Sequence, residues 1–166
     1  MIDVRIRKTK LDDYEDIKVI HKEVGMVLQN MRPDVFDVNG YIEISPELFA
    51  DVLKNYFMLS AVIKVRDKER VVGFLRAVKK DYSYSTESAL FINELAVSEK
   101  YRKHGIGTLL MGKAEGFAKS HGLFVALNVW PNRKAMAFYE RLGYVPRTVV
   151  LEKKRGDILN NENEFE

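Results

Sequence analysis

The pattern of apolar and polar positions predicts that strands and helices alternate along the chain. Residues 2–7 alternate charged and apolar side chains, as an edge strand does. A helix begins at Asp12 and carries a stripe of apolar positions at helical spacing: Tyr14, Ile17, Ile20, Val24, Val27 and Leu28. A second helix begins after Ser45 with proline at its first position, and residues 57–65 and 70–79 predict an antiparallel hairpin.

The second half of the chain continues this alternation. A strand at residues 90–97 is followed by a glycine-rich turn and by a helix that Gly122 is expected to end in the left-handed conformation. Residues 123–129 are nearly all apolar, which is typical of a strand covered on both faces. A helix at about residues 133–142 and a last strand at residues 144–153 complete a mixed sheet with helices on both faces.

Length and composition predict one globular domain, residues 1–155, followed by a tail. The chain has 166 residues, of which 46% are hydrophobic and 31% are charged, so it can bury one sizeable core. Residues 156–166 are polar and acidic and contain no Lys or Arg, so residues 1–155 carry 27 basic and 20 acidic side chains. This excess of positive charge suits a polyanionic ligand, either nucleic acid or a phosphorylated cofactor.

Several classes of site are excluded by the residues that the chain lacks. With no cysteine, it has no disulfide, no thiolate metal site and no cysteine nucleophile. His21 and His121 stand alone on predicted helices, so we expect surface or capping residues and no metal. The sequence has no signal-peptide core and no apolar run near the ~20 residues that span a bilayer. We expect a cytoplasmic protein with no membrane partner.

Residues 91–110 combine a buried strand, a basic turn with two glycines and the start of a helix. A helix start offers unpaired N–H groups and the positive end of a dipole. Gly105 and Gly107 let a phosphate approach the backbone without meeting a Cβ atom. The neighbouring positive charges are Arg102, Lys103 and His104. The stretch therefore predicts a phosphate-binding turn.

This turn belongs to a set of motifs that resembles the GNAT superfamily of acyl-CoA N-acyltransferases. The signature of Arg or Gln, two variable residues, Gly, one variable residue and Gly or Ala is met at Arg102, Gly105 and Gly107. It follows a strand that ends in ELAV, and it precedes the sequence NRKAMAFYERLGY at residues 132–144. The resemblance covers residues 90–153 closely and the first half of the chain only in the order of its elements.

The resemblance implies a single-domain α/β (α+β) fold with a mixed, mostly antiparallel sheet flanked by helices. A splayed central pair of strands would form the acyl-CoA cleft, where backbone groups pair with the pantetheine arm and polarise the thioester carbonyl near Leu95. The co-substrate is expected to be acetyl-CoA. The residues expected to bind it are Leu95, Ala96, Val97, Arg102, Lys103, His104, Gly105, Ile106, Gly107, Thr108, Asn132 and Tyr139. Asn132 is also an ordinary helix N-cap, and both roles can hold together.

Two residues are expected to carry the chemistry of direct acetyl transfer to a primary amine in a ternary complex. Tyr139 has the place that the family gives to the donor for the departing thiolate, and a phenol of pKa about 10 stays protonated at neutral pH. The alternative is a core aromatic packed for its ring. Glu94 is the candidate base, because a carboxylate on an apolar strand must be hydrogen-bonded, have a raised pKa or face a wet cleft. A ligand for the substrate cation, or a partner of a basic residue, is an equal alternative.

Other functions stay open on the sequence. A non-catalytic acyl-CoA-binding or sensing module would need neither Tyr139 nor Glu94. Nucleic-acid binding is not expected, because the basic residues do not gather on one predicted helix. The amine acceptor is not identified, although residues 32–44, 80–88 and 144–150 are expected to frame it. An exposed edge of the last strand would permit a homodimer.

Overall fold

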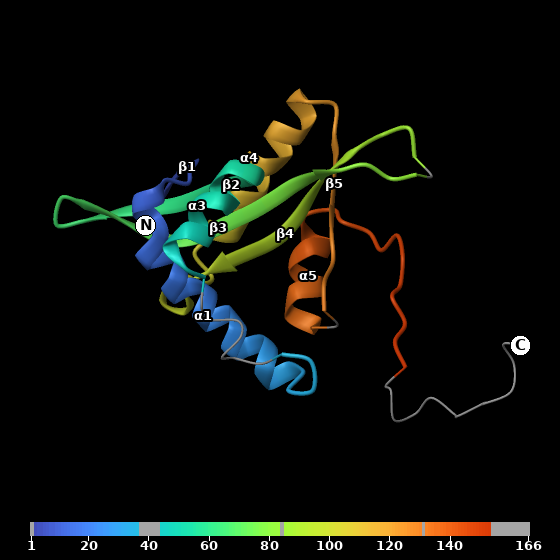
Figure 1. Ribbon diagram of the computed structural model, residues 1–166, viewed down its shortest axis with the longest axis horizontal. Helices are drawn as coiled ribbons and strands as arrows, with labels where there is room; N and C mark the ends of the chain where they lie inside the picture. The colour runs from blue at the N-terminus through green and yellow to red at the C-terminus, as the bar shows by residue number, and fades with distance from the viewer. Residues whose placement is uncertain (1, 37–43, 84, 131, 154–166) are drawn as a thin grey trace, which may run out of the picture. The chain divides into compact units, whose positions relative to one another are not determined.

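The computed structural model describes residues 2–36, 44–83, 85–130 and 132–153 (Figure 1). It divides into two compact units, Met1–Asn128 and Val129–Glu166. The elements are β1 (Arg5–Lys8), the 3-10 helix η1 (Leu11–Asp13), α1 (Tyr14–Met31), α3 (Pro46–Asn55), β2 (Phe57–Val65), β3 (Lys68–Lys80), β4 (Ala89–Val97), the 3-10 helix η2 (Glu99–Tyr101), α4 (Ile106–Ser120), β5 (Phe124–Leu127) and α5 (Arg133–Arg141). Every described strand lies in the first unit, and α5 lies in the second.

The first unit is built on a mixed sheet with the order β1-β2-β3-β4-β5. Strands β1 to β4 are antiparallel to their neighbours, and β5 runs parallel to β4 after the crossover through α4. The predicted mixed, mostly antiparallel sheet is therefore confirmed. Strand β5 pairs with β4 only from Ala89 to Ile92. Residues 93–97 of β4 continue along β3 without β5, so the described strand pair separates at this point.

Helices cover both faces of this sheet, as the sequence predicts (Figure 1). The apolar side chains of α1 and α3, among them Ile17, Ile20 and Phe49, pack against Phe74 of β3 and Ala96 of β4. On the opposite face, α4 buries its own stripe of apolar side chains: Ile106, Leu110, Met111, Ala114 and Ala118. None of the helices in the described ranges is both long and apolar enough to cross a membrane.

The ends of the helices agree with the local signals in the sequence. At the start of α3, the Ser45 hydroxyl accepts a hydrogen bond from the Leu48 N–H at 3.2 Å, and Pro46 takes the first position. Helix α4 ends before Gly122, whose φ of +64° is the expected left-handed conformation. Capping residues act within a few positions of the helix, which is why they can be found from sequence.

A bulge in β4 decides which side chains face α1 and α3. Ala77 of β3 pairs with Ile92, whereas the preceding Arg76 pairs with Glu94, so Asn93 is an extra residue in β4. Residues paired across antiparallel strands share a face of the sheet, and neighbours along a strand have opposite faces. Ile92 and Glu94 therefore point to opposite faces, although two residues of a regular strand would share one. The bulge turns Glu94 toward the same face as Arg76 and Phe74.

Two predicted strands differ from the structure. The strand predicted at residues 123–129 is shorter, Phe124–Leu127, and its side chains are half-buried and not covered on both faces. Residues 144–153 form no strand, and Val145, Val149 and Val150 are at least 80% exposed. The β-branched residues carry the local preference, but a strand also needs a partner with which to pair. The homodimer expected along this edge stays a prediction.

An ion pair joins β1 to the start of the first helix. The Arg7 guanidinium donates to both carboxylate oxygens of Asp13 at 2.7 Å, and the Ser60 hydroxyl donates to the same carboxylate at 2.9 Å. Burial raises the pKa of Asp13, but the hydrogen bonds from Arg7, the Lys10 N–H and Ser60 lower it by more than burial raises it. The pKa of Asp13 therefore lies below its ordinary 3.8. The charged form of Asp13 therefore stabilises the fold.

We expect Asp13→Asn to lower the free energy of unfolding by about 3 kcal/mol at neutral pH, because it leaves Arg7 without its buried partner. Because the pKa of Asp13 is lower in the folded protein than in the unfolded chain, its charge stabilises the fold at every pH above the unfolded pKa, near 3.8. This stabilisation is lost as the pH falls through the pKa of the folded protein. The difference between wild type and variant should therefore shrink below about pH 4. Urea unfolding at a series of pH values measures it.

The matched control is Glu69→Gln. Glu69 accepts a hydrogen bond from the same Arg7, but its side chain is exposed. Glu69→Gln should therefore lower the free energy of unfolding by clearly less than Asp13→Asn does. Equal losses in the two variants would contradict the role given to Asp13.

Candidate functional site

The turn between β4 and α4 leaves the start of α4 without a side-chain cap. Gly105 is the N-cap residue with a φ of +77°, and it has no side chain that could accept from the N–H groups of Gly107 or Thr108. Helix α3, in contrast, has the hydroxyl of Ser45 at this place. The first N–H groups of α4, together with the positive end of its dipole, are therefore suited to bind an anion.

Three exposed basic residues, Arg102, Lys103 and His104, form the turn itself. Nε of Arg102 donates to the Val97 carbonyl at 3.0 Å, which ties the turn to the end of β4. Nδ1 of His104 lies 2.8 Å from the Arg102 carbonyl and is the donor, because a carbonyl only accepts. Lys103 has a left-handed φ of +65°. The turn predicted from the sequence is thus present, and Arg102 and His104 hold its shape, while phosphate binding there stays a prediction.

Glu23 of α1 fixes the same turn, and the sequence did not single it out. Its carboxylate accepts from the Ser98 hydroxyl at 3.1 Å and from the Glu99 N–H at 2.7 Å. Because Glu99 begins η2, this carboxylate caps the short helix that leads into the turn. No local signal could reveal a contact between residues so far apart in sequence.

The expected binding residues of β4 lie beside this turn on the part of the strand that β5 does not cover. Leu95, Ala96 and Val97 follow the last residue paired with β5, Ile92, so no described strand pairs with that edge of their backbone, and it can pair with a ligand that has amide groups. Ile106 has a side chain only 2% exposed and can contribute only its backbone to binding. The open edge and the uncapped helix together fit a long ligand that has amides at one end and phosphate at the other.

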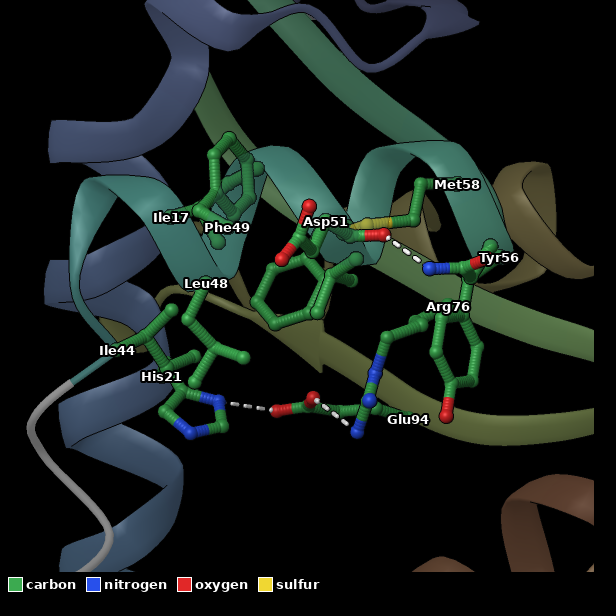
Figure 2. A pocket seen from close by; sticks show the side chains of 13 residues that line it. Ile17, His21, Ile44, Leu48, Phe49, Asp51, Tyr56, Met58, Arg76 and Glu94 are labelled. Atoms are coloured by element: carbon green, nitrogen blue, oxygen red, sulfur yellow. Dashed lines mark hydrogen bonds and ion pairs between the residues drawn. The ribbon is translucent and has the colours of Figure 1, made fainter.

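A pocket of about 510 Å³ lies on the face of the sheet that α1 and α3 cover, between these helices and strands β2 to β4 (Figure 2). Most of its wall is apolar: Ile17, Ile44, Leu48, Phe49, Val52, Met58 and Phe74. The polar side chains of the described lining are His21, Asp51, Asn55, Tyr56, Arg76 and Glu94. A concave apolar surface with a few convergent polar groups is typical of a site for a small molecule.

Glu94 is held in this pocket by two basic side chains (Figure 2). Its Oε1 lies 2.7 Å from Nδ1 of His21, and its Oε2 lies 3.6 Å from Nη2 of Arg76. The Arg76 guanidinium also lies over the ring of Tyr56 at 5.0 Å from its centre. Glu94 thus meets two of the three expected conditions, since it is hydrogen-bonded and faces a cleft.

The prediction that His21 is a surface or capping residue is wrong. His21 is only 8% exposed, and α1 directs its ring toward Glu94. His21 lies one helical turn from Ile17 and next to Ile20, in the stripe of α1 that faces the sheet. Its place in this apolar stripe could have indicated from the sequence that it is buried. His121, in contrast, is the C-cap residue of α4, and its Nδ1 donates to the Phe117 carbonyl at 2.8 Å.

Asn132 and Tyr139 belong to the second unit. The side-chain oxygen of Asn132 accepts from the N–H groups of Lys134 and Ala135 at 2.9 and 3.3 Å, so the N-cap role is confirmed. Tyr139 contacts the rings of Phe138 and Tyr144, with centroids 5.0 and 5.8 Å away. Burial raises the pKa of Tyr139 to about 12. At neutral pH the phenol is therefore protonated and keeps a hydrogen that it can donate.

The acceptor frame expected from sequence overlaps the described lining of this pocket at Ile44. Residues 37–43 of that frame lie outside the described part of the chain, and residues 144–150 belong to the second unit. The other described lining residues come from α1, α3 and the central strands. The sequence predicted α3 as a helix but not its part in a pocket, because the same apolar pattern serves a core and an apolar pocket alike.

Comparison with known proteins gives a family and a partial relative. A profile of the Acetyltransferase (GNAT) family matches residues 28–144. An uncharacterized N-acetyltransferase of Methanocaldococcus jannaschii is 39% identical over 62 residues, which are 36% of this chain and 27% of that protein. The aligned segment therefore spans little more than a quarter of the relative's length.

Solved structures agree with the fold. A mutant of the BH1408 protein from Bacillus halodurans has a TM-score of 0.78 and 24% identity, over 90% of this chain and 98% of that chain. An aminoglycoside acetyltransferase from an uncultured soil metagenomic sample, in complex with sisomicin, has a TM-score of 0.66 and 17% identity, over 91% of this chain and 94% of that chain. These likenesses show the fold alone.

Gly73 offers a test of how closely β3, β4 and α4 are packed beneath the turn. A Cβ atom at Gly73 would lie 2.9 Å from the Ala96 carbonyl oxygen and 3.3 Å from side-chain atoms of Ile106 and Val97. We expect Gly73→Ala to lower the free energy of unfolding by about 1–3 kcal/mol, because backbone atoms would have to move. Gly112→Ala on α4 is the control, since its Cβ meets nothing within 4 Å and alanine favours a helix. Urea unfolding compares them, and equal stability of both variants would contradict the close packing.

Proposed function

The chain belongs to the acetyltransferase (GNAT) family, and we propose that it transfers the acetyl group of acetyl-CoA to a primary amine of a small molecule or peptide. The observation that carries the proposal is the position of Glu94. This buried carboxylate faces an apolar pocket, and it lies on the same strand as the open backbone edge of residues 95–97. A proton acceptor and a place for a thioester thus share β4.

The proposed site for acetyl-CoA consists of the start of α4 and the unpaired edge of β4. Acetyl-CoA, when bound, supplies an acetyl group activated as a thioester. The N–H groups at the start of α4 and the cations Arg102 and Lys103 would hold its diphosphate. The open edge of Leu95 to Val97 would pair with the amides of its pantetheine arm. Gly105 fits this use, because it gives the turn its left-handed residue without adding a side chain.

In the proposed reaction the amine nitrogen bonds to the acetyl carbon and the carbon–sulfur bond breaks. The products are an N-acetylated amine and coenzyme A. Glu94 accepts the amine proton through Oε2, because Oε1 is engaged by His21 and the 3.6 Å between Oε2 and Arg76 is longer than a hydrogen bond. The contacts with His21 and Arg76 hold the carboxylate in this position.

Tyr139 is proposed to donate a hydrogen bond to the departing sulfur. Its pKa of about 12 makes the phenol a weaker acid than an ordinary thiol, whose pKa is about 8.5. The phenol therefore stabilises a thiolate without giving up its proton completely, and the thiol finally takes its proton from solvent. This role differs from full proton donation in its pH dependence.

We expect Glu94→Gln to lower kcat/KM by about 100-fold or more, because the amide cannot accept the amine proton. The amide oxygen can still accept from His21, so the fold should be retained, which circular dichroism checks. The rate is measured as thiol released from acetyl-CoA with an amine acceptor.

The control for this variant is Glu15→Gln, which changes an exposed carboxylate on α1 outside the pocket and should leave the rate unchanged. An unchanged rate and pH profile in Glu94→Gln would remove the base role and favour a ligand for the substrate cation. Acetyl-CoA binding without thiol release over a broad panel of amines would favour a non-catalytic acyl-CoA-binding module.

We expect Tyr139→Phe to lower kcat by roughly 10- to 100-fold, because the leaving sulfur loses its donor. The shape of the pH profile between pH 6 and pH 9 should not change, since a phenol of pKa about 12 does not titrate there. Tyr144→Phe is the matched control, because it removes a hydroxyl from the neighbouring ring. A Tyr139→Phe enzyme with unaltered kcat would contradict the donor role.

A further inference from the structure

Arg76 brings a positive charge into the pocket from the strand next to Glu94. The two residues are paired across β3 and β4, and the Arg76 side chain is 28% exposed. Its Nη2 lies 3.6 Å from Oε2 of Glu94, and its guanidinium carbon lies 5.0 Å from the centre of the Tyr56 ring. Neither contact is a hydrogen bond, and a guanidinium has five N–H donors. Arg76 can therefore donate to a bound molecule.

The Glu94 carboxylate and the Arg76 guanidinium lie side by side in the lining of the pocket (Figure 2). An amine that donates to Oε2 of Glu94 also comes close to Nη2 of Arg76, because these two atoms are 3.6 Å apart. The guanidinium repels a cationic amine at this distance, but it attracts a carboxylate on the neighbouring carbon. Such a carboxylate can accept charge-assisted hydrogen bonds from Arg76.

We infer that the acceptor is an α-amino acid with an apolar side chain, whose amine meets Glu94 and whose carboxylate meets Arg76. The inference rests on the proposed function, because it assigns the acceptor side of the same site. An α-amino acid has its amine and its carboxylate on one carbon, which suits the close spacing of Glu94 and Arg76. Its side chain would pack on the apolar wall formed by Leu48, Phe49 and Met58. The product is then an N-acetylated amino acid with its carboxylate unchanged.

Matched pairs of substrates test the role of the carboxylate. Leucine and isopentylamine differ only by the carboxylate, as do phenylalanine and phenethylamine. We expect each amino acid to have a kcat/KM at least about tenfold higher than its amine, and tenfold corresponds to about 1.4 kcal/mol. The values are compared per concentration of unprotonated amine, because the carboxylate also changes the pKa of the amine. The inference is overturned if the monoamine reacts as well as the amino acid in either pair.

Variants of Arg76 test whether this residue binds the acceptor or only holds Glu94 in place. Arg76→Gln removes the charge and keeps a hydrogen-bond donor. We expect it to raise the KM for leucine about tenfold or more and to change the kcat/KM for isopentylamine little, because only leucine has a carboxylate that loses its partner. Arg76→Lys keeps the charge without the planar fork, so it should retain part of the preference for leucine.

The control is Arg70→Gln. Arg70 is an exposed arginine of the same strand that pairs with Asp16 at 3.1 Å, and it does not line the pocket, so both substrates should keep their rates. Circular dichroism checks that each variant is folded. If Arg76→Gln lowers kcat/KM equally for leucine and isopentylamine, Arg76 only positions Glu94, and the inference fails.

Binding separates this inference from the transfer reaction. The melting temperature of the protein is measured with leucine or isopentylamine at millimolar concentration, with and without coenzyme A. If leucine stabilises more and Arg76→Gln removes the difference, the acceptor class stands even when no thiol is released from acetyl-CoA, and the transfer reaction falls instead. If isopentylamine releases thiol as fast as leucine, the transfer reaction stands and the acceptor class falls. If neither compound stabilises the protein or releases thiol, both are overturned.

Discussion

A carboxylate among apolar side chains requires partners, and the bulge in β4 gives Glu94 its partners. The extra residue Asn93 turns Glu94 to the face of the sheet where Arg76 lies opposite it and where α1 brings His21. In a regular strand Glu94 would share the face of Ile92 and would point toward the α4 side. The candidate base, its two basic neighbours and the pocket all depend on this one irregular position.

Beyond the bulge, β4 lies between two different surroundings. Its side chains at Glu94 and Ala96 face α1 and α3, whereas its backbone edge beyond Ile92 is left open by β5. The turn that follows is fixed from both sides, by Arg102 on the Val97 carbonyl and by Glu23 on Ser98 and Glu99. These contacts hold the edge of β4 and the start of α4 at a fixed position relative to each other.

Local signals were sufficient for much of this architecture. The cap at Ser45, the left-handed glycines and the stripe of α1 act within a few residues, so the helices and the glycine-rich turn could be predicted. The site was only partly predictable. Glu94 stood out as a charge on an apolar strand, but the approach of His21 and the pairing with Arg76 depend on a register that includes a bulge. The strand expected at residues 144–153 failed because strand formation depends on a partner that no local pattern specifies.

The close approach at Gly73 has a geometric consequence for the site. Gly73 lies under the junction of β4 and α4, and Arg76 lies three residues further along the same strand, beside Glu94. At about 3.3 Å per residue, this extended segment spans roughly 10 Å. Because β3 is hydrogen-bonded to a strand on each side, this length fixes the distance between the turn at the start of α4 and the Glu94 carboxylate. The distance that an acyl donor must span between these two places is thus set by the rise per residue of a central strand and not by a flexible loop.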